Sequence, residues 1–167
     1  MKTPRKDRKT PPTTGLPRFV PPPWAEVCER DYREYSAMVP APIDAEMVAL
    51  TLLVAGLHDL ANATTWDEWS SLVGLAILAR RAAEDLADAA DFPGDVAATM
   101  RHRRECGCGG CELIQAASRR PELVVGYILD LLGNLQARDP GEVTWLSMLV
   151  HLAAACGIRY EYLAAQP

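Results

Sequence analysis

Three cysteines and a histidine fall within ten residues of one another in the segment RHRRECGCGGC, residues 101–111. The four side chains that could bind a metal are His102, Cys106, Cys108 and Cys111. One imidazole and three thiolates make a Cys3His set, which satisfies the tetrahedral coordination of zinc. Three glycines between and beside the cysteines give the backbone the freedom that a tight chelate needs. The segment therefore predicts a zinc site built from local ligands.

The origin of the fourth zinc ligand is open. If His102 points away, Cys28, His151 or Cys156 could replace it from a neighbouring helix, and the sequence does not choose between them. A glycine-rich turn with three free thiols is the interpretation without metal, since the second C-x-x-C pair of a zinc ribbon is missing. Four protein ligands close the coordination sphere, whereas a catalytic zinc keeps one open position. We therefore expect the zinc to be structural.

Arginines surround the cysteine segment and form the one basic cluster in an otherwise acidic body. They are Arg101, Arg103, Arg104, Arg119 and Arg120. A rigid zinc site would present such side chains to the phosphates of a nucleic acid. The alternative is a set of solvated arginines that pair with nearby glutamates such as Glu112 and Glu122.

The first 18 residues differ in charge from the rest of the chain. Their net charge is +5, and because the whole chain carries −5, residues 19–167 carry −10. The candidate phosphate-binding residues in this segment are Lys2, Arg5, Lys6, Arg8 and Lys9. Many prolines and threonines without apolar periodicity predict a disordered or extended tail over residues 1–23. The tail is predicted either to contact nucleic acid or to remain solvated.

Four carboxylates at helical spacing raise the alternative of a metal-dependent enzyme. They are Glu84, Asp85, Asp88 and Asp91, and such groups can coordinate magnesium, as in all-α nucleotide pyrophosphohydrolases. Those enzymes also need an E-x-x-E pattern in a preceding helix, which this chain lacks. No Ser-His-Asp arrangement, phosphate loop or dinucleotide fingerprint is present. A solvated acidic face is therefore favoured over a nucleotide hydrolase.

Helical periodicity covers almost all of residues 24–167, so the groups in this range must be positioned by helices and the turns between them. Prolines, capping residues and apolar stripes predict helices that begin at about residues 24, 43, 65, 95, 112, 121 and 142, with a short helical turn at 159–165. Pro40 closes the first helix, the third runs to about residue 90, and the last long helix ends at Gly157. The two short helices run from about 95 toward His102 and over 112–118. No alternating strand of convincing length and no fixed repeat is present. The sequence therefore predicts an all-α class: a compact bundle of six or seven helices forming one domain over residues 24–167, with a zinc-binding elbow between two short helices.

For three of these helices the sequence also predicts which residues are buried or form the ends. Met47, Leu50, Val54 and Leu57 form one stripe, and the apolar residues beside it leave little polar face, which predicts a helix buried on most sides. Thr65 and Glu68 match a capping box. The helix that follows has an alanine-rich seam that would let a partner helix approach closely: Trp69, Leu72, Ala76, Ala79, Ala83, Leu86 and Ala90. Gly157 is expected to end the last long helix.

Composition favours a cytoplasmic protein. The longest nearly apolar run, residues 47–57, is shorter than the ~20 residues of a membrane-spanning helix, and no secretory signal is recognisable. In a reducing compartment, clustered cysteines indicate metal ligands rather than disulfides. We expect a non-catalytic, zinc-stabilised helical binding protein, an adaptor or regulator, that contacts a protein partner or a second copy through its helices, with nucleic acid as a further candidate partner. A structural or assembly subunit of a larger particle is the alternative.

Overall fold

The all-α class is confirmed over the part of the chain that the structure describes. The computed structural model describes residues 22–39, 44–61, 65–91, 112, 115–116, 118–139 and 143–166. Within these ranges the chain forms five α-helices and one 3₁₀ helix and no strand. None of these helices is both long and apolar enough to cross a bilayer.

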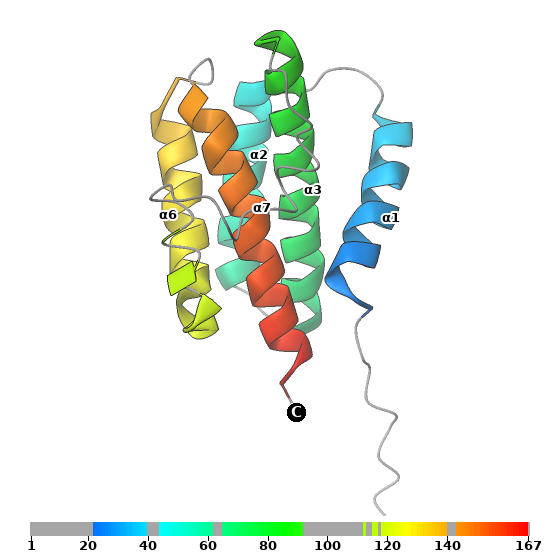
Figure 1. The fold of residues 1–167 in the computed structure, drawn as a ribbon, viewed down its shortest axis with the longest axis vertical. Coiled ribbons are helices and arrows are strands. Elements are labelled where there is room, and N and C mark those ends of the chain that lie inside the picture. The colour runs from blue at the N-terminus through cyan, green and yellow to red at the C-terminus, as the bar shows by residue number, and fades with distance from the viewer. Residues whose placement is uncertain are drawn as a thin grey trace, which may run out of the picture.

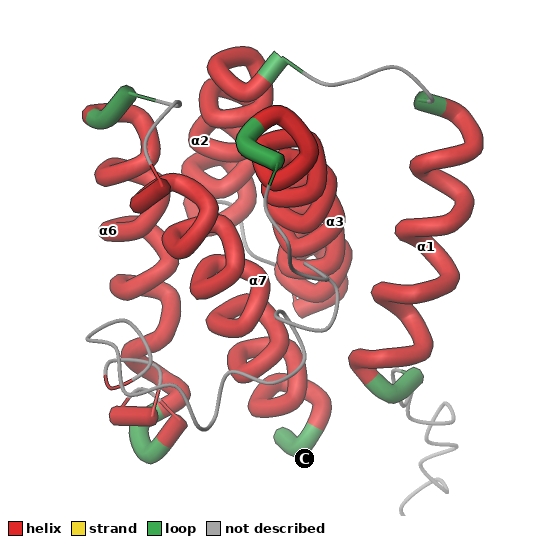
Figure 2. The backbone as a smooth tube through the Cα atoms, turned by 45° about the horizontal axis from the view of Figure 1, so that its top comes forward, coloured by secondary structure: helices red, strands yellow, loops and turns green. Residues whose placement is uncertain are grey.

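Four of the α-helices form a bundle, and the remaining one lies outside it (Figure 1). The elements are α1 (Trp24–Met38), α2 (Ala45–Ala61), α3 (Thr65–Ala89), η1 (Pro121–Leu123), α6 (Val124–Ala137) and α7 (Val143–Ala164). In the bundle α2 packs against α3 and α6, and α7 packs against the same two helices. Among the described elements α1 contacts α3 and α7 only, so it covers one outer side of the bundle (Figure 2).

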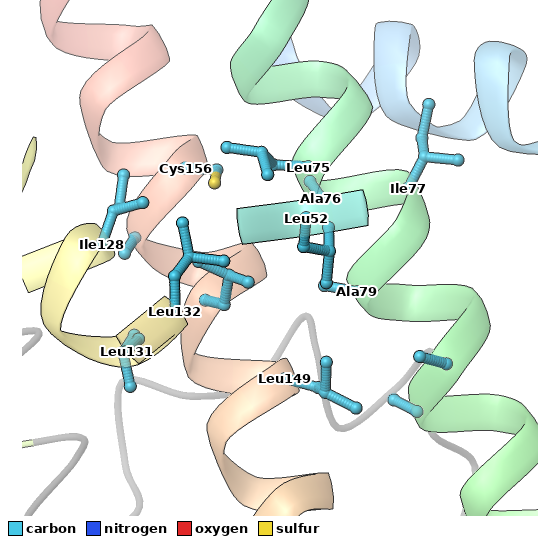
Figure 3. Packing of buried hydrophobic residues seen from close by; sticks show 14 of the residues in the cluster. Leu52, Leu75, Ala76, Ile77, Ala79, Ile128, Leu131, Leu132, Leu149 and Cys156 are labelled. Atoms are coloured by element: carbon cyan, nitrogen blue, oxygen red, sulfur yellow. The ribbon is translucent and has the colours of Figure 1, made fainter. Parts of the chain in front are cut away.

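The core is centred on the contact between α3 and α7, which is the most extensive in the fold. The alanine seam of α3 is confirmed at its centre, where Ala79 and Ala83 are completely buried. Small side chains let α7 approach closely, and its Leu149 and Cys156 are completely buried in the same core (Figure 3). The apolar stripe expected on α6 is also confirmed, since Ile128 and Leu132 are each 1% exposed.

Helix boundaries follow the local signals in the sequence. The side chain of Asp44 caps α2, because its Oδ1 accepts hydrogen bonds from the backbone N–H of Glu46 at 2.9 Å and of Met47 at 3.2 Å. Pro121 occupies the first turn of η1, where its missing N–H costs no helical hydrogen bond. The predicted helices around 95–102 and 112–118 fall mostly outside the described residues, so the total of six or seven helices stays a prediction.

The prediction that Gly157 ends the last long helix is wrong. Helix α7 continues through Gly157 to Ala164. A Cβ atom at position 157 would lie 2.6 Å from Nε1 of Trp24, so the glycine is explained by the close approach of α1. The Trp24 ring also lies beside Tyr160, with ring centroids 5.1 Å apart. A glycine that accommodates a tertiary contact therefore resembles a helix C-cap in the sequence.

Candidate functional site

The apolar stripe of α2 faces solvent. Met47 is 61% exposed, Leu50 44% and Val54 66%. The prediction that this helix is buried on most sides is therefore wrong. Because α2 has only α3 and α6 as described neighbours, it buries one face, which carries Val48 and Leu52.

These three residues form a surface that suits another helix, which we call the α2 stripe. Positions 47, 50 and 54 are spaced by three and four residues, the a/d spacing of a two-helix seam. Large apolar side chains that gather on one exposed face are typical of interaction surfaces. Thr51, next to the stripe, is exposed and satisfies its hydroxyl within the helix by donating to the carbonyl oxygen of Met47 at 2.8 Å.

The predicted zinc ligands cannot be placed. His102, Cys106, Cys108 and Cys111 all lie outside the described residues. Among the residues that are described, no cluster of three or more histidine, cysteine or acidic side chains could hold a metal ion.

The three alternative zinc ligands do lie in described helices. His151 of α7 is 3% exposed, and its Nδ1 lies 2.5 Å from the carbonyl oxygen of Ser147, to which it can only donate. Cys156 is completely buried, and Cys28 of α1 is half-buried near it. Both cysteines are free thiols.

Burial makes these two thiols poor nucleophiles at neutral pH. Desolvation by burial, with a smaller effect from the Asp31 charge, raises the pKa of Cys28 to about 12. Burial likewise raises the pKa of Cys156. Zinc binds the thiolate, and both groups stay protonated at neutral pH. A bound zinc ion would itself lower the pKa of a coordinating thiol, so the fourth ligand stays open between His102, Cys28, His151 and Cys156.

Of the candidate nucleic-acid-binding residues, two are described. Arg119 and Arg120 are both exposed. Arg120 pairs with Glu122 at 3.8 Å, and because its side chain is 72% exposed the pair leaves the guanidinium accessible to other anions. The remaining candidates lie outside the described residues: Lys2, Arg5, Lys6, Arg8, Lys9, Arg101, Arg103 and Arg104.

The four carboxylates considered as a magnesium site differ in their contacts and exposure. Glu84 accepts hydrogen bonds from Arg80, at 3.0 Å, and from the hydroxyl of Tyr32 on α1. Asp85 pairs with Arg81 of the preceding turn at 3.4 Å. Asp88 and Asp91 are exposed at the end of α3. Glu84 and Asp85 are thus part-buried in ion pairs with arginines of α3, and only Asp88 and Asp91 match the interpretation of a solvated acidic face.

A polar cluster holds α1 on the bundle. Arg80 of α3 donates to Glu29 of α1 at 3.0 Å, and its guanidinium carbon lies 3.7 Å from the centroid of the Tyr32 ring. Tyr32 in turn donates to Glu84. The sequence pattern shows the Arg80–Glu84 spacing, but the contacts with α1 join residues more than fifty positions apart and have no local signal.

A second ion pair is more deeply buried. Nε of Arg159 on α7 lies 2.7 Å from Oε1 of Glu68 on α3, and the two side chains are 15% and 11% exposed. Arg159 also donates to the carbonyl oxygen of Pro121 at 3.5 Å. Glu68, expected in a capping box, therefore serves a tertiary contact across 91 positions of sequence.

Function has to be inferred from these features of the chain itself. Comparisons with protein-family models, with curated proteins and with solved structures found no match. Within the described ranges, features able to bind another molecule include the α2 stripe, the exposed arginines beside η1, and two cavities along α1.

Proposed function

We propose that this protein is a non-catalytic helical binding protein whose α2 stripe docks another helix. The observation that carries the proposal is the exposure of Met47, Leu50 and Val54 on one face of a helix whose other face is in the core. Water contact with three large apolar side chains is unfavourable, and a partner helix would remove it.

The occupant that we assign to the stripe is a second copy of this chain. Two copies both supply residues at the spacing of a helical seam, and a two-fold interface requires a surface that fits itself. Charge supports the same choice. The chain carries −5, so two copies repel in general, but residues 47–57 contain no charged side chain and can approach without that cost.

The expected association is weak. A single helix from each chain buries less surface than the ~1,200–2,000 Å² of a standard stable interface. We therefore expect a concentration-dependent dimer. Sedimentation equilibrium over a wide range of protein concentrations tests this, because a chain that stays monomeric throughout would instead need a different protein as the occupant of the stripe. Oligomers larger than a dimer would favour the alternative, a structural or assembly subunit of a larger particle.

The zinc elbow is the second part of the proposal. We propose that His102, Cys106, Cys108 and Cys111 hold a structural zinc between two short helices, which would bring the bundle to six or seven helices. The donor types fit zinc, and all four lie within ten residues of one another in the sequence.

Removing one thiolate from this set is expected to release the metal. Elemental analysis should find about one zinc per chain in the purified protein and almost none in Cys108→Ser, because three ligands bind zinc far more weakly than four. Cys28→Ser is the matched control and should keep its zinc. Full zinc content in His102→Ala would move the fourth ligand to Cys28, His151 or Cys156, and a wild-type protein without zinc would refute the site.

Nucleic acid is proposed as a further partner of the basic groups. The exposure of Arg119 and Arg120 supports this proposal. If the tail and the arginines bind phosphates, affinity for duplex DNA should fall at least about tenfold between ~50 and ~200 mM salt, because bound counterions are released. Arg119→Ala with Arg120→Ala should flatten this dependence, whereas Arg33→Ala on α1, also an exposed arginine, should not. Absence of binding at ~50 mM salt would refute the nucleic-acid proposal.

A further inference from the structure

A cavity lies between α1 and α3, on the side of the fold away from α2 and α6. Its volume is about 460 Å³, within the range of small-molecule sites. The walls are mainly apolar and include Val27 of α1 with Trp69, Val73 and Ile77 of α3. The lining also includes polar side chains, namely Arg30, Asp31, Ser70 and Tyr160 of α7. Arg30 is 59% exposed and stands at the edge of the cavity.

The cavity owes part of its space to a glycine in the middle of α3. Gly74 lines it, and a Cβ atom at that position would meet nothing within 4 Å. Its φ is not positive, so neither the backbone nor the packing requires a glycine there. Glycine lowers the stability of a helix interior relative to alanine. The lack of a side chain at position 74 adds to the space between α1 and α3.

The lining indicates what kind of molecule fits. The indole of Trp69 offers a flat apolar surface on which a planar ring can stack. Arg30 engages Asp31 through Nε at 2.7 Å, and its side chain is 59% exposed, so its two terminal amino groups can donate to a group at the edge. A ligand with a flat apolar body and one acceptor or anionic end would satisfy both features.

We infer that this cavity binds a small planar amphiphile, an aromatic or polycyclic molecule with one anionic or hydrogen-bond-accepting end. The apolar body lies along Trp69, Val73 and Gly74, and the polar end meets Arg30. This site is independent of the α2 stripe, which lies on another helix.

A different occupant would be the part of this chain that precedes Pro22. The carbonyl oxygen of Pro22 accepts a hydrogen bond from the hydroxyl of Tyr160 at 2.9 Å, and Pro22 itself lines the cavity. Phe19 and Val20 are close enough in sequence to reach it, since three residues span about 10 Å. The experiment has to separate these two occupants.

The probe is 1-anilinonaphthalene-8-sulfonate, which has a planar apolar body and one anionic end and fluoresces when it leaves water. Titration of the full chain should show one saturable site. Gly74→Leu, which fills the cavity, should weaken binding at least about tenfold. Gly133→Leu is the matched control: it adds the same side chain at an exposed glycine of α6, which also has nothing within 4 Å of its Cβ, and should leave binding unchanged.

Further variants distinguish loss of the cavity from misfolding of a variant and from binding of the probe at another surface. Arg30→Met changes only the edge of the cavity and should weaken binding of the anionic probe. An unchanged circular dichroism spectrum of this variant would show that its fold is intact. Unchanged binding in Gly74→Leu, or loss of binding in Leu50→Glu, would overturn the site. Stronger binding in Phe19→Ser with Val20→Ser would also overturn it, because the cavity would then belong to the chain's own N-terminal segment.

Discussion

Replacing Arg159 with methionine is expected to lower the free energy of unfolding by about 3–5 kcal/mol. The pair that Arg159 forms with Glu68 is 2.7 Å long, and both side chains are almost fully shielded from water. Methionine keeps most of the apolar stem of arginine but leaves a buried carboxylate without its counter-charge. Urea unfolding of the variant at pH 7 measures the effect.

The matched control is an exposed pair of the same length. Arg30 and Asp31 are also 2.7 Å apart, but their side chains are 59% and 31% exposed, so Arg30→Met should leave the free energy of unfolding nearly unchanged. Adding Glu68→Gln to Arg159→Met should recover much of the lost stability, because no unpaired charge is then buried. Equal losses in Arg159→Met and Arg30→Met would contradict the burial of the Arg159–Glu68 pair.

Two glutamates on the α2 stripe are expected to weaken self-association at least about a hundredfold. Leu50→Glu and Val54→Glu remove two apolar side chains from each copy, and burial of one such side chain contributes about 1.5–3 kcal/mol. They also bring carboxylates of the two copies together. Sedimentation equilibrium of the double variant should therefore give the mass of a monomer at concentrations where the wild type associates.

The control for this variant carries the same new charge elsewhere. Asn134 and Gln136 are exposed on α6, and Asn134→Glu with Gln136→Glu, which adds the same two charges, should leave the association unchanged. Because Leu50 and Val54 are exposed in the single chain, the stripe variant should keep the wild-type thermal unfolding temperature when both are measured at low concentration. Association that survives the double variant would place the contact on another surface.

Local signals predicted the helices well. Pro121 lies in the first turn of a helix, as the proline rule predicts, and the alanine seam of α3 is buried at its centre, as its periodicity indicates. These features depend on neighbours within one or two turns of helix, which a sequence displays directly.

Features that depend on distant residues were not predictable in the same way. Apolar residues surround much of α2, so periodicity alone could not tell which face meets α3 and α6 and which meets solvent. The local pattern around Gly157 is typical of a helix end, and the sequence does not reveal that Trp24 packs on this glycine. Arg159, the partner of Glu68, is 91 positions away, and Tyr32, the second partner of Glu84, is 52 positions away, so no local pattern reveals either contact.

Photo-crosslinking from the α2 stripe tests the proposed docking surface most directly. A benzophenone side chain at position 50 would react with whatever covers the stripe, and a mixture of unlabelled and nitrogen-15-labelled chains identifies links between two copies by mass spectrometry. We expect crosslinks that join residues 45–61 of one copy to residues 45–61 of another. Links confined to a single chain, or to a surface far from α2 in the second copy, would contradict the proposal.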